Sequence, residues 1–309
     1  MSEQALEHDN PLMAAAIATT PSALASHART GNQVSVWRRF RRNRLVLVAL
    51  VVFALLVIGV AVVPLFIPVA SVTAQVRNAT FAAPTLATPF GRDEFGRDAF
   101  VRSLYGGRTS LMIALIATLV NTVLGVLLGM IAGYLGGWPD AIIDRFIELI
   151  LTLPFLLLLI LAAAVLQPSP TSIVIILGLF GWPQLARIVR GEFVSLKQRE
   201  FVEAARTSGA SVSRIIIRHI LPNTMAPIIV TATLLLAQNL IAEATISYLG
   251  LGIKPPAPSW GNMLTEAQNY LIRAPYLAIF PGMLILITVL CINLLGDGLR
   301  DALDPRARQ

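Results

Sequence analysis

Five long stretches of this chain contain no charged residue, and each is long enough for a helix that crosses a lipid bilayer. They cover residues 45–67, 109–139, 149–186, 220–242 and 274–296. A membrane-spanning helix needs about 20 apolar residues, so the third stretch has room for two crossings. Its segment Q-P-S-P-T-S, residues 167–172, cannot continue a helix and predicts a turn between them. The sequence therefore predicts an all-α membrane protein with six transmembrane helices.

Composition and charge placement also favour a membrane protein. Hydrophobic residues make up 56% of the chain and charged residues 13%, which is unusual for a soluble domain. The net charge of +7 could indicate a nucleic-acid-binding surface, but five arginines lie together within residues 38–44, directly before the first apolar stretch. Such a cluster is typical of the cytoplasmic side of a membrane helix. We therefore expect a lipid bilayer and no nucleic acid as a partner, with both termini in the cytoplasm.

The loop after the first apolar stretch opposes this orientation, because it would place several arginines outside. These are Arg77, Arg92, Arg97, Arg102 and Arg108. The positive-inside bias weakens in a loop of about 40 residues. The loop also contains Asp93, Glu94 and Asp98, so we expect part of its positive charge to be paired locally.

These features divide the chain into five parts. Residues 1–34 show no apolar period and are expected to be a disordered cytoplasmic tail. Residues 35–70 hold the basic segment and a first transmembrane helix that we expect to be retained as an anchor. Residues 71–108 are expected to form an external loop, 109–300 a five-helix core and 301–309 a cytoplasmic C-terminus. Within the core, residues 191–218 form a polar cytoplasmic loop.

The sequence contains no motif for catalysis, nucleotide binding or metal binding. Its two lysines, Lys197 and Lys254, follow Leu and Ile, so no phosphate-binding loop G-x-x-x-x-G-K-[ST] is present. The three histidines have no second His or Cys at ligand spacing; they are His8, His27 and His219. We therefore expect no enzymatic activity, no cofactor and no metal in this chain.

Several polar residues fall within the apolar stretches or at their edges: Asn121, Glu148, Gln238, Asn239, Glu243 and Asn293. Hydrogen bonding between helices is the favoured interpretation for each amide, and contact with a transported solute is the alternative. Glu148 follows Asp144 and Arg145 and is expected in an ion cluster at the membrane boundary. Glu243 is expected near the external mouth. No residue is assigned to substrate binding.

The polar segment from Glu203 to Pro222 differs most from the apolar stretches that flank it. Residues 199–208 are good helix formers, Gly209 suits a left-handed helix stop, and Ser211 is a plausible N-cap for the next helix. The segment therefore predicts a short helix across the end of a helical hairpin. A plain solvated loop is the alternative interpretation.

Specific residues of this segment resemble a known family. Glu203, Ala204, Ala205 and Gly209, followed by Leu221 and Pro222, match the cytoplasmic loop of permease subunits in ATP-binding-cassette importers. The sequence R-H-I-L-P-N at 218–223 resembles the dipeptide, oligopeptide and nickel branch.

Two external segments extend the likeness. P-F-G-R-D-E-F-G-R-D at 89–98 resembles the H-P-F-G-T-D-x-x-G-R-D pattern of that branch, with Thr88 in place of His and Arg92 in place of Thr. Residues 248–261 match its loop before the last span, where we expect an irregular backbone and Trp260 as an interface anchor.

The resemblance implies a six-helix permease, of the MetI-like fold, in the bacterial inner membrane. Its implied partners are a second related permease chain, two cytoplasmic ATPase domains and an external substrate-binding protein. The residues expected to couple the chain to the ATPase are Glu203, Ala204, Ala205 and Gly209. The implied cargo is a di- or oligopeptide, with nickel or glutathione as alternatives. A self-sufficient secondary transporter is the competing class, but it would be expected to show an inverted repeat, which the two halves lack.

Overall fold

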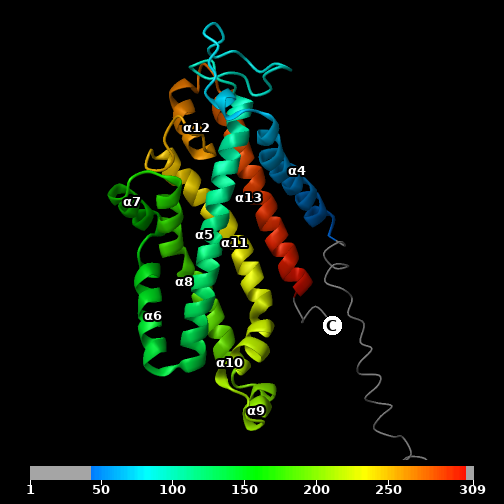
Figure 1. The fold of residues 1–309 in the computed structure, drawn as a ribbon, viewed down its shortest axis with the longest axis vertical. Helices are drawn as coiled ribbons and strands as arrows, with labels where there is room; N and C mark the ends of the chain where they lie inside the picture. Colours follow the sequence, from blue (N-terminus) through cyan, green and yellow to red (C-terminus); the bar gives the residue numbers. More distant parts are fainter. Residues whose placement is uncertain (1–42, 304–309) are drawn as a thin grey trace, which may run out of the picture.

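The computed structural model describes residues 43–303 and consists there of helices joined by loops, with one isolated β-bridge between Arg92 and Asp98 (Figure 1). The predicted disordered tail, four of the five clustered arginines and residues 304–309 lie outside the described residues. Five long helices run alongside one another: α4 (Arg44–Phe66), α5 (Ala99–Leu135), α8 (Pro170–Leu196), α11 (Leu221–Tyr248) and α13 (Tyr276–Leu303).

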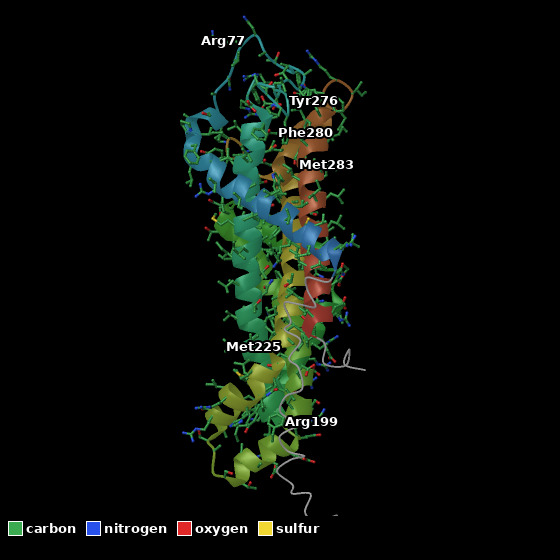
Figure 2. All side chains as sticks on the ribbon, turned by 90° about the vertical axis from the view of Figure 1, so that its right-hand side faces the viewer. Arg77, Arg199, Met225, Tyr276, Phe280 and Met283 are labelled. Atoms are coloured by element: carbon green, nitrogen blue, oxygen red, sulfur yellow. The ribbon has the colours of Figure 1, made fainter. Side chains whose placement is uncertain are left out.

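Shorter elements connect or cap these helices. They are η1 (Val69–Val72), α6 (Gly137–Thr152), α7 (Phe155–Val165), α9 (Glu200–Thr207), α10 (Val212–Arg214), the π-helix η2 (Ile215–Ile220), α12 (Trp260–Ala267) and η3 (Gln268–Tyr270). Helices α9 and α12 lie at opposite ends of the bundle (Figure 1). Figure 2 shows the same arrangement from the side, with Arg77 at one end and Arg199 at the other.

Among residues 43–303, 5 helices are long and apolar enough to cross a membrane, or up to 6 when the bent pair α6 and α7 counts as one span. The larger number matches the predicted six. The bend of 91° between α6 and α7 was not predicted. It falls at Leu153, whose ψ of 140° is extended, because Pro154 disfavours the helical conformation of the residue before it. The first predicted crossing of the third apolar stretch therefore corresponds to the bent pair α6 and α7, which begins at Gly137, and not to a straight helix from residue 149.

The predicted turn at residues 167–172 is confirmed. Ser169 is the N-cap of α8, and its Oγ accepts a hydrogen bond from the Ser172 backbone N at 3.1 Å. Pro170 follows in the first turn of the helix, where its missing N–H has no intrahelical partner to lose.

Helix α5 starts ten residues before the apolar stretch at residue 109, so the predicted external loop 71–108 is helical in its last part. The Asp98 side chain caps the helix by accepting from the backbone N of Phe100 at 2.9 Å and of Val101 at 3.2 Å. An aspartate N-cap satisfies two otherwise free N–H groups. The helix can therefore begin well outside the apolar stretch.

The most extensive helix contact within residues 43–303 lies between α5 and α8. Gly125, Gly129 and Gly133 are spaced every four residues on α5, so they share one face. A Cβ on Gly129 would lie 2.5 Å from the carbonyl O of Ala186 on α8, and a Cβ on Gly133 would lie 2.7 Å from the carbonyl O of Arg190. The two backbones therefore approach as closely as in small-residue contacts between membrane helices.

A buried polar layer joins α5, α8 and α11 in the middle of the bundle. Asn239 Nδ2 donates to Thr118 Oγ1 at 2.9 Å. With the Asn121 amide oriented so that its oxygen accepts from Asn239 at 3.2 Å, its nitrogen donates to the carbonyl O of Gly178 at 3.0 Å. Both asparagines are at most 2% exposed. Hydrogen bonding between helices, the interpretation favoured from the sequence, is confirmed for these two residues.

Candidate functional site

The polar segment forms the short helix α9 at one end of the bundle, as predicted (Figure 1). The helix is followed by its C-cap Ser208 and then by Gly209, whose φ of 78° is left-handed. The Gly209 N donates to the Arg206 O at 3.0 Å, and the Ala210 N donates to the Ala205 O at 3.0 Å. These two bonds form a Schellman motif, in which glycine is the favoured residue at the left-handed position. The predicted helix stop is therefore confirmed.

The four residues expected to couple to an ATPase do not share one face. Glu203, Ala204 and Gly209 are exposed, whereas Ala205 is half-buried and packs with the fully buried Val202 against the bundle. The Ala205 side chain therefore contacts its own chain, and the coupling role expected for these four residues stays a prediction. The exposed face of α9 includes Phe201, Glu203 and Ala204.

Buried apolar contacts hold α9 in place. Val202 and Ile215 belong to the same cluster as Val189 and Phe193 of α8 and Ile220 at the entrance to α11. Glu203 also pairs with Arg206 at 3.2 Å, but both side chains are more than half exposed, so this ion pair adds little stability. The rigid attachment of α9 therefore comes from packing, not from its charges.

The connection from α9 into α11 contains a π-helical turn. Ser211 has the extended backbone of an N-cap, but its side chain makes no capping hydrogen bond, so the expected side-chain cap is absent. The Leu221 N donates to the Ile216 O, five residues earlier, and Pro222 has no N–H to donate. The Asn223 Nδ2 donates to the His219 O at 2.6 Å.

Ionic contacts tie together the helices around α9. Arg190 of α8 pairs with Asp140 of α6, with Nη2 to Oδ2 at 3.0 Å, and its Nη1 lies 3.4 Å from Asp144. Lys197 Nζ donates to the carbonyl O of Gly133 near the end of α5 at 2.9 Å. The predicted boundary cluster exists only in part, because Arg145 pairs with Glu148 at 3.1 Å on the surface while Asp144 pairs with α8.

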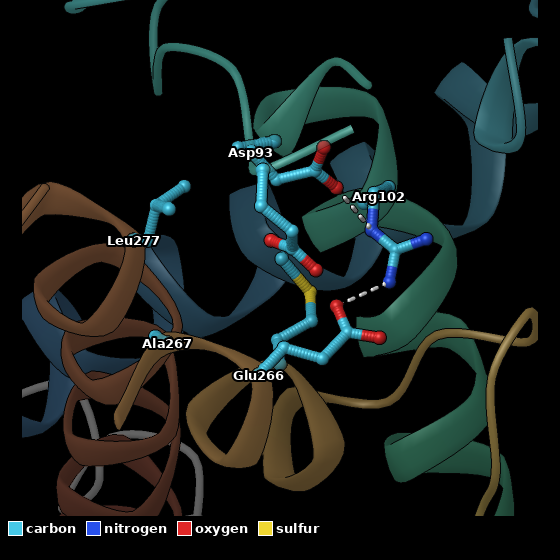
Figure 3. Close-up of a pocket in the computed structure, with 8 residues that line it drawn as sticks. Asp93, Arg102, Glu266, Ala267 and Leu277 are labelled. Carbon is cyan, nitrogen blue, oxygen red and sulfur yellow. Dashed lines mark hydrogen bonds and ion pairs between the residues drawn. The ribbon is translucent and has the colours of Figure 1, made fainter. Parts of the chain in front are cut away.

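A second charged cluster lies beside α12, at the end of the bundle opposite α9 (Figure 1), and Figure 3 shows Asp93, Arg102 and Glu266 within it. Arg97 Nε lies 2.5 Å from Asp93, and Arg102 Nη2 lies 2.8 Å from Glu266 Oε2 on α12. The Arg102 side chain is only 1% exposed. Burial raises the pKa of Glu94 above its ordinary value, and the nearby carboxylates of Asp93 and Glu266 act in the same direction. The cluster therefore joins the loop before α5 to α5 and α12.

The expected local pairing of the external loop is confirmed for Asp93 and Glu94, which lie 2.5 Å and 3.4 Å from Arg97. The two positions that depart from the family pattern make local contacts. The Thr88 hydroxyl lies 2.9 Å from that of Thr85, and Arg92 Nη1 donates to the Gly96 O at 2.8 Å.

Trp260 is not an interface anchor. It is fully buried at the start of α12, and its Nε1 donates to the Ser103 O at 2.9 Å. Ser259 and Asn262 form a capping box at this helix start, so part of the expected irregular loop is helical. Glu243 is also fully buried, with Ser247 Oγ donating to its Oε1 at 2.9 Å.

Comparison with known proteins identifies the family. Residues 125–309 match the family described as binding-protein-dependent transport system inner membrane component, and residues 34–84 match the N-terminal TM domain of oligopeptide transport permease C. The chain belongs to this transport-system family. It is therefore a multi-pass permease of the ATP-binding-cassette importer type, as the sequence predicted.

Two relatives of this chain are permeases whose names state different cargoes. The chain is 44% identical over 208 residues to the oligopeptide transport system permease protein OppC of Escherichia coli (strain K12), covering 67% of this chain and 69% of that one. It is 45% identical over 169 residues to the glutathione transport system permease protein GsiD of Shigella flexneri serotype 5b (strain 8401), covering 55% and 56%.

A solved structure supports the fold. A chain of the MetNI methionine ABC transporter, in an inward facing conformation, superposes with a TM-score of 0.54 at 18% identity. The match covers 67% of this permease and 97% of that chain. The predicted all-α, MetI-like fold is therefore confirmed.

Proposed function

We propose that this permease carries short peptides inward across the bacterial cytoplasmic membrane, with energy from ATP hydrolysis on separate subunits that dock on α9. The observation that carries the proposal is the exposed face of α9, which is held rigidly at one end of the bundle by buried Val202 and a Schellman motif. A helix fixed in this way can transmit a displacement to α8 and α11, which share its apolar cluster.

The proposed assembly contains a second related permease chain, two cytoplasmic ATPase domains and an external substrate-binding protein. The beginning of α4 and the end of α13 both point towards the α9 end of the bundle (Figure 1). This direction supports cytoplasmic termini on the ATPase side. The chain itself has no phosphate-binding loop, so we expect the isolated permease to bind no ATP.

Peptide is the proposed class of cargo, and glutathione, itself a small peptide, falls within it. The relatives named above are an oligopeptide permease and a glutathione permease. A metal cargo has less support, because residues 43–303 contain no group of three His, Cys, Asp or Glu side chains arranged to hold a metal ion.

The docking proposal can be tested with a charge placed on the exposed face of α9. Ala204→Glu adds a carboxylate beside Glu203 on that face, and Ala70→Glu introduces the same side chain at an exposed position of η1 at the other end of the bundle. Both variants keep the apolar contacts of α9 intact. Uptake of a labelled tripeptide and ATPase activity co-purifying with tagged permease are measured at equal membrane levels.

We expect Ala204→Glu to lose co-purifying ATPase activity and uptake, and Ala70→Glu to retain both. Equal activity of the two variants would contradict docking on α9. Full ATPase association together with no peptide uptake by the unmodified permease would contradict the proposed cargo.

A further inference from the structure

An open hollow lies between α8, α11 and α13, in the half of the bundle nearer α9. It has a volume of about 420 Å³ and is lined by Ile188 of α8, by Pro227, Thr231 and Leu234 of α11, and by Arg300 of α13. Sites for small molecules typically enclose about 300–1,000 Å³. The hollow is therefore large enough for a solute of the proposed size.

Three side-chain amides, one from each helix, lie on the same helix faces as this hollow. Gln184 precedes Ile188 by one turn of α8, Gln238 follows Leu234 by one turn of α11, and Asn293 precedes Arg300 by two turns of α13. Gln184 and Gln238 are exposed and Asn293 is half-buried. Gln184 and Gln238 therefore present their amides at the surface of this chain.

Gln238 and its neighbour Asn239 lie on different faces of α11. Asn239 points into the bundle and donates to Thr118 at 2.9 Å, whereas Gln238 points outward. Ten residues separate Gln238 from the helix end at Tyr248, which corresponds to about 15 Å along the axis. This depth is close to the middle of a hydrocarbon layer of about 30 Å.

Lipid is an unfavourable neighbour for these amides, because an amide without a partner in hydrocarbon loses its hydrogen bonds with water. The exposed face of α5 illustrates what lipid requires: it presents Leu115, Leu119 and Leu127, which are 60%, 63% and 46% exposed. The face of α11 that carries Gln238 also presents Ile241, which is 48% exposed, so it is the amide at position 238 that requires a neighbour able to form hydrogen bonds.

We propose that this face of α8, α11 and α13, called here the amide face, forms one wall of a hydrated path for a polar, amide-bearing solute. Carboxamides both donate and accept hydrogen bonds, so they complement the peptide groups of such a solute. The assignment rests on the proposed transport function and adds to it the residues that contact the cargo: Gln184, Gln238 and Asn293.

Cysteine accessibility in the assembled transporter tests the path. In a Cys291→Ser background, Gln238→Cys is compared with Leu119→Cys on the exposed, leucine-rich face of α5. The reagent is a charged, membrane-impermeant thiosulfonate. We expect Gln238→Cys to react at least about tenfold faster, because thiosulfonates react with the thiolate, which forms in water and not in lipid. Excess tripeptide should slow the reaction. Equal rates at the two positions, or a rate unaffected by peptide, would overturn the proposal.

Substitution of the amide provides a second test. Gln238→Leu should reduce tripeptide uptake by about three- to tenfold, the effect of losing one hydrogen bond, while Gln238→Asn retains most of it. Both should leave permease levels and co-purifying ATPase activity unchanged, whereas Asn239→Leu should lower the amount of folded permease. Normal uptake by Gln238→Leu would overturn the amide contact.

The two proposals fail in different ways. An unreactive Gln238→Cys in a transporter that still takes up tripeptide would overturn only the path, and cross-linking of that cysteine to the second permease chain would identify the amide face as a subunit contact instead. Absence of peptide uptake by the unmodified transporter would overturn the proposed function itself.

Discussion

The close contact between α5 and α8 makes Gly129→Ala the most informative change to the bundle. The added Cβ would lie 2.5 Å from the Ala186 O and 2.8 Å from the Val189 Cβ. Either α5 or α8 must therefore shift to make room for it. Overpacking of this kind costs about 1–3 kcal/mol. Against this, alanine is favoured over glycine within a helix by about 0.5–1 kcal/mol. The net expectation is a loss of stability of roughly 0–2.5 kcal/mol.

Gly191→Ala is a matched control on α8, because a Cβ there meets nothing within 4 Å and the backbone has no positive φ. The helix-propensity gain is the same for both variants and cancels, so their difference isolates the contact: about 1–3 kcal/mol. Thermal stability is measured as the fraction of monodisperse permease that remains after heating in detergent. Gly129→Ala should unfold several degrees below Gly191→Ala. Equal or reversed midpoints would refute the close approach of α5 and α8.

Three further variants test separate features of the account. Gly209→Val should weaken ATPase association and uptake more than Gly209→Asn, because the φ of 78° disfavours a β-branched residue and is tolerated by asparagine; equal uptake would contradict the need for the left-handed stop. Arg102→Met should lower the free energy of unfolding by about 1–3 kcal/mol, since the Glu266 carboxylate loses its partner at 2.8 Å and keeps only the longer contact of 3.4 Å with Arg97, and adding Glu266→Gln should restore part of the loss. The raised pKa of Glu94 means that its favourable contribution is complete below the ordinary value of 4.5 and is lost as the pH rises through the folded-state pKa. Glu94→Gln should therefore melt above the unmodified permease at neutral pH, with the advantage disappearing as the pH falls towards 4.5; a constant difference across this range would contradict the assignment.

Features coded by neighbouring residues could be predicted from the sequence. The lengths of the uncharged stretches predicted the membrane helices, because the hydrocarbon layer has a known thickness and disfavours charged side chains. The stop of α9 was predictable because Gly209 and the helix before it are adjacent in the chain. Two local signals were overlooked. The Leu153–Pro154 pair indicates the bend between α6 and α7, and the four-residue spacing of Gly125, Gly129 and Gly133 indicates a close helix contact.

Features that depend on distant parts of the chain could not be predicted in the same way. Glu266 reaches Arg102 across a sequence separation of 164 residues, so the pair becomes visible only once α12 is placed beside α5. The same holds for Trp260, whose indole is buried against Ser103. The burial of Ala205 could not be predicted either. Helical spacing gives the angle between Ala204 and Ala205 around α9, but not which of the two faces packs on the bundle.

The central claim is that α9 is the point at which this permease contacts its ATPase, and site-specific cross-linking tests it directly. A cysteine at Ala204, in a Cys291→Ser background, is linked with a short bifunctional reagent in the assembled transporter and compared with a cysteine at Ala70. We expect a covalent product between the permease and the ATPase subunit from position 204 and none from position 70. A complex that still hydrolyses ATP but yields no such product from position 204 would contradict the claim.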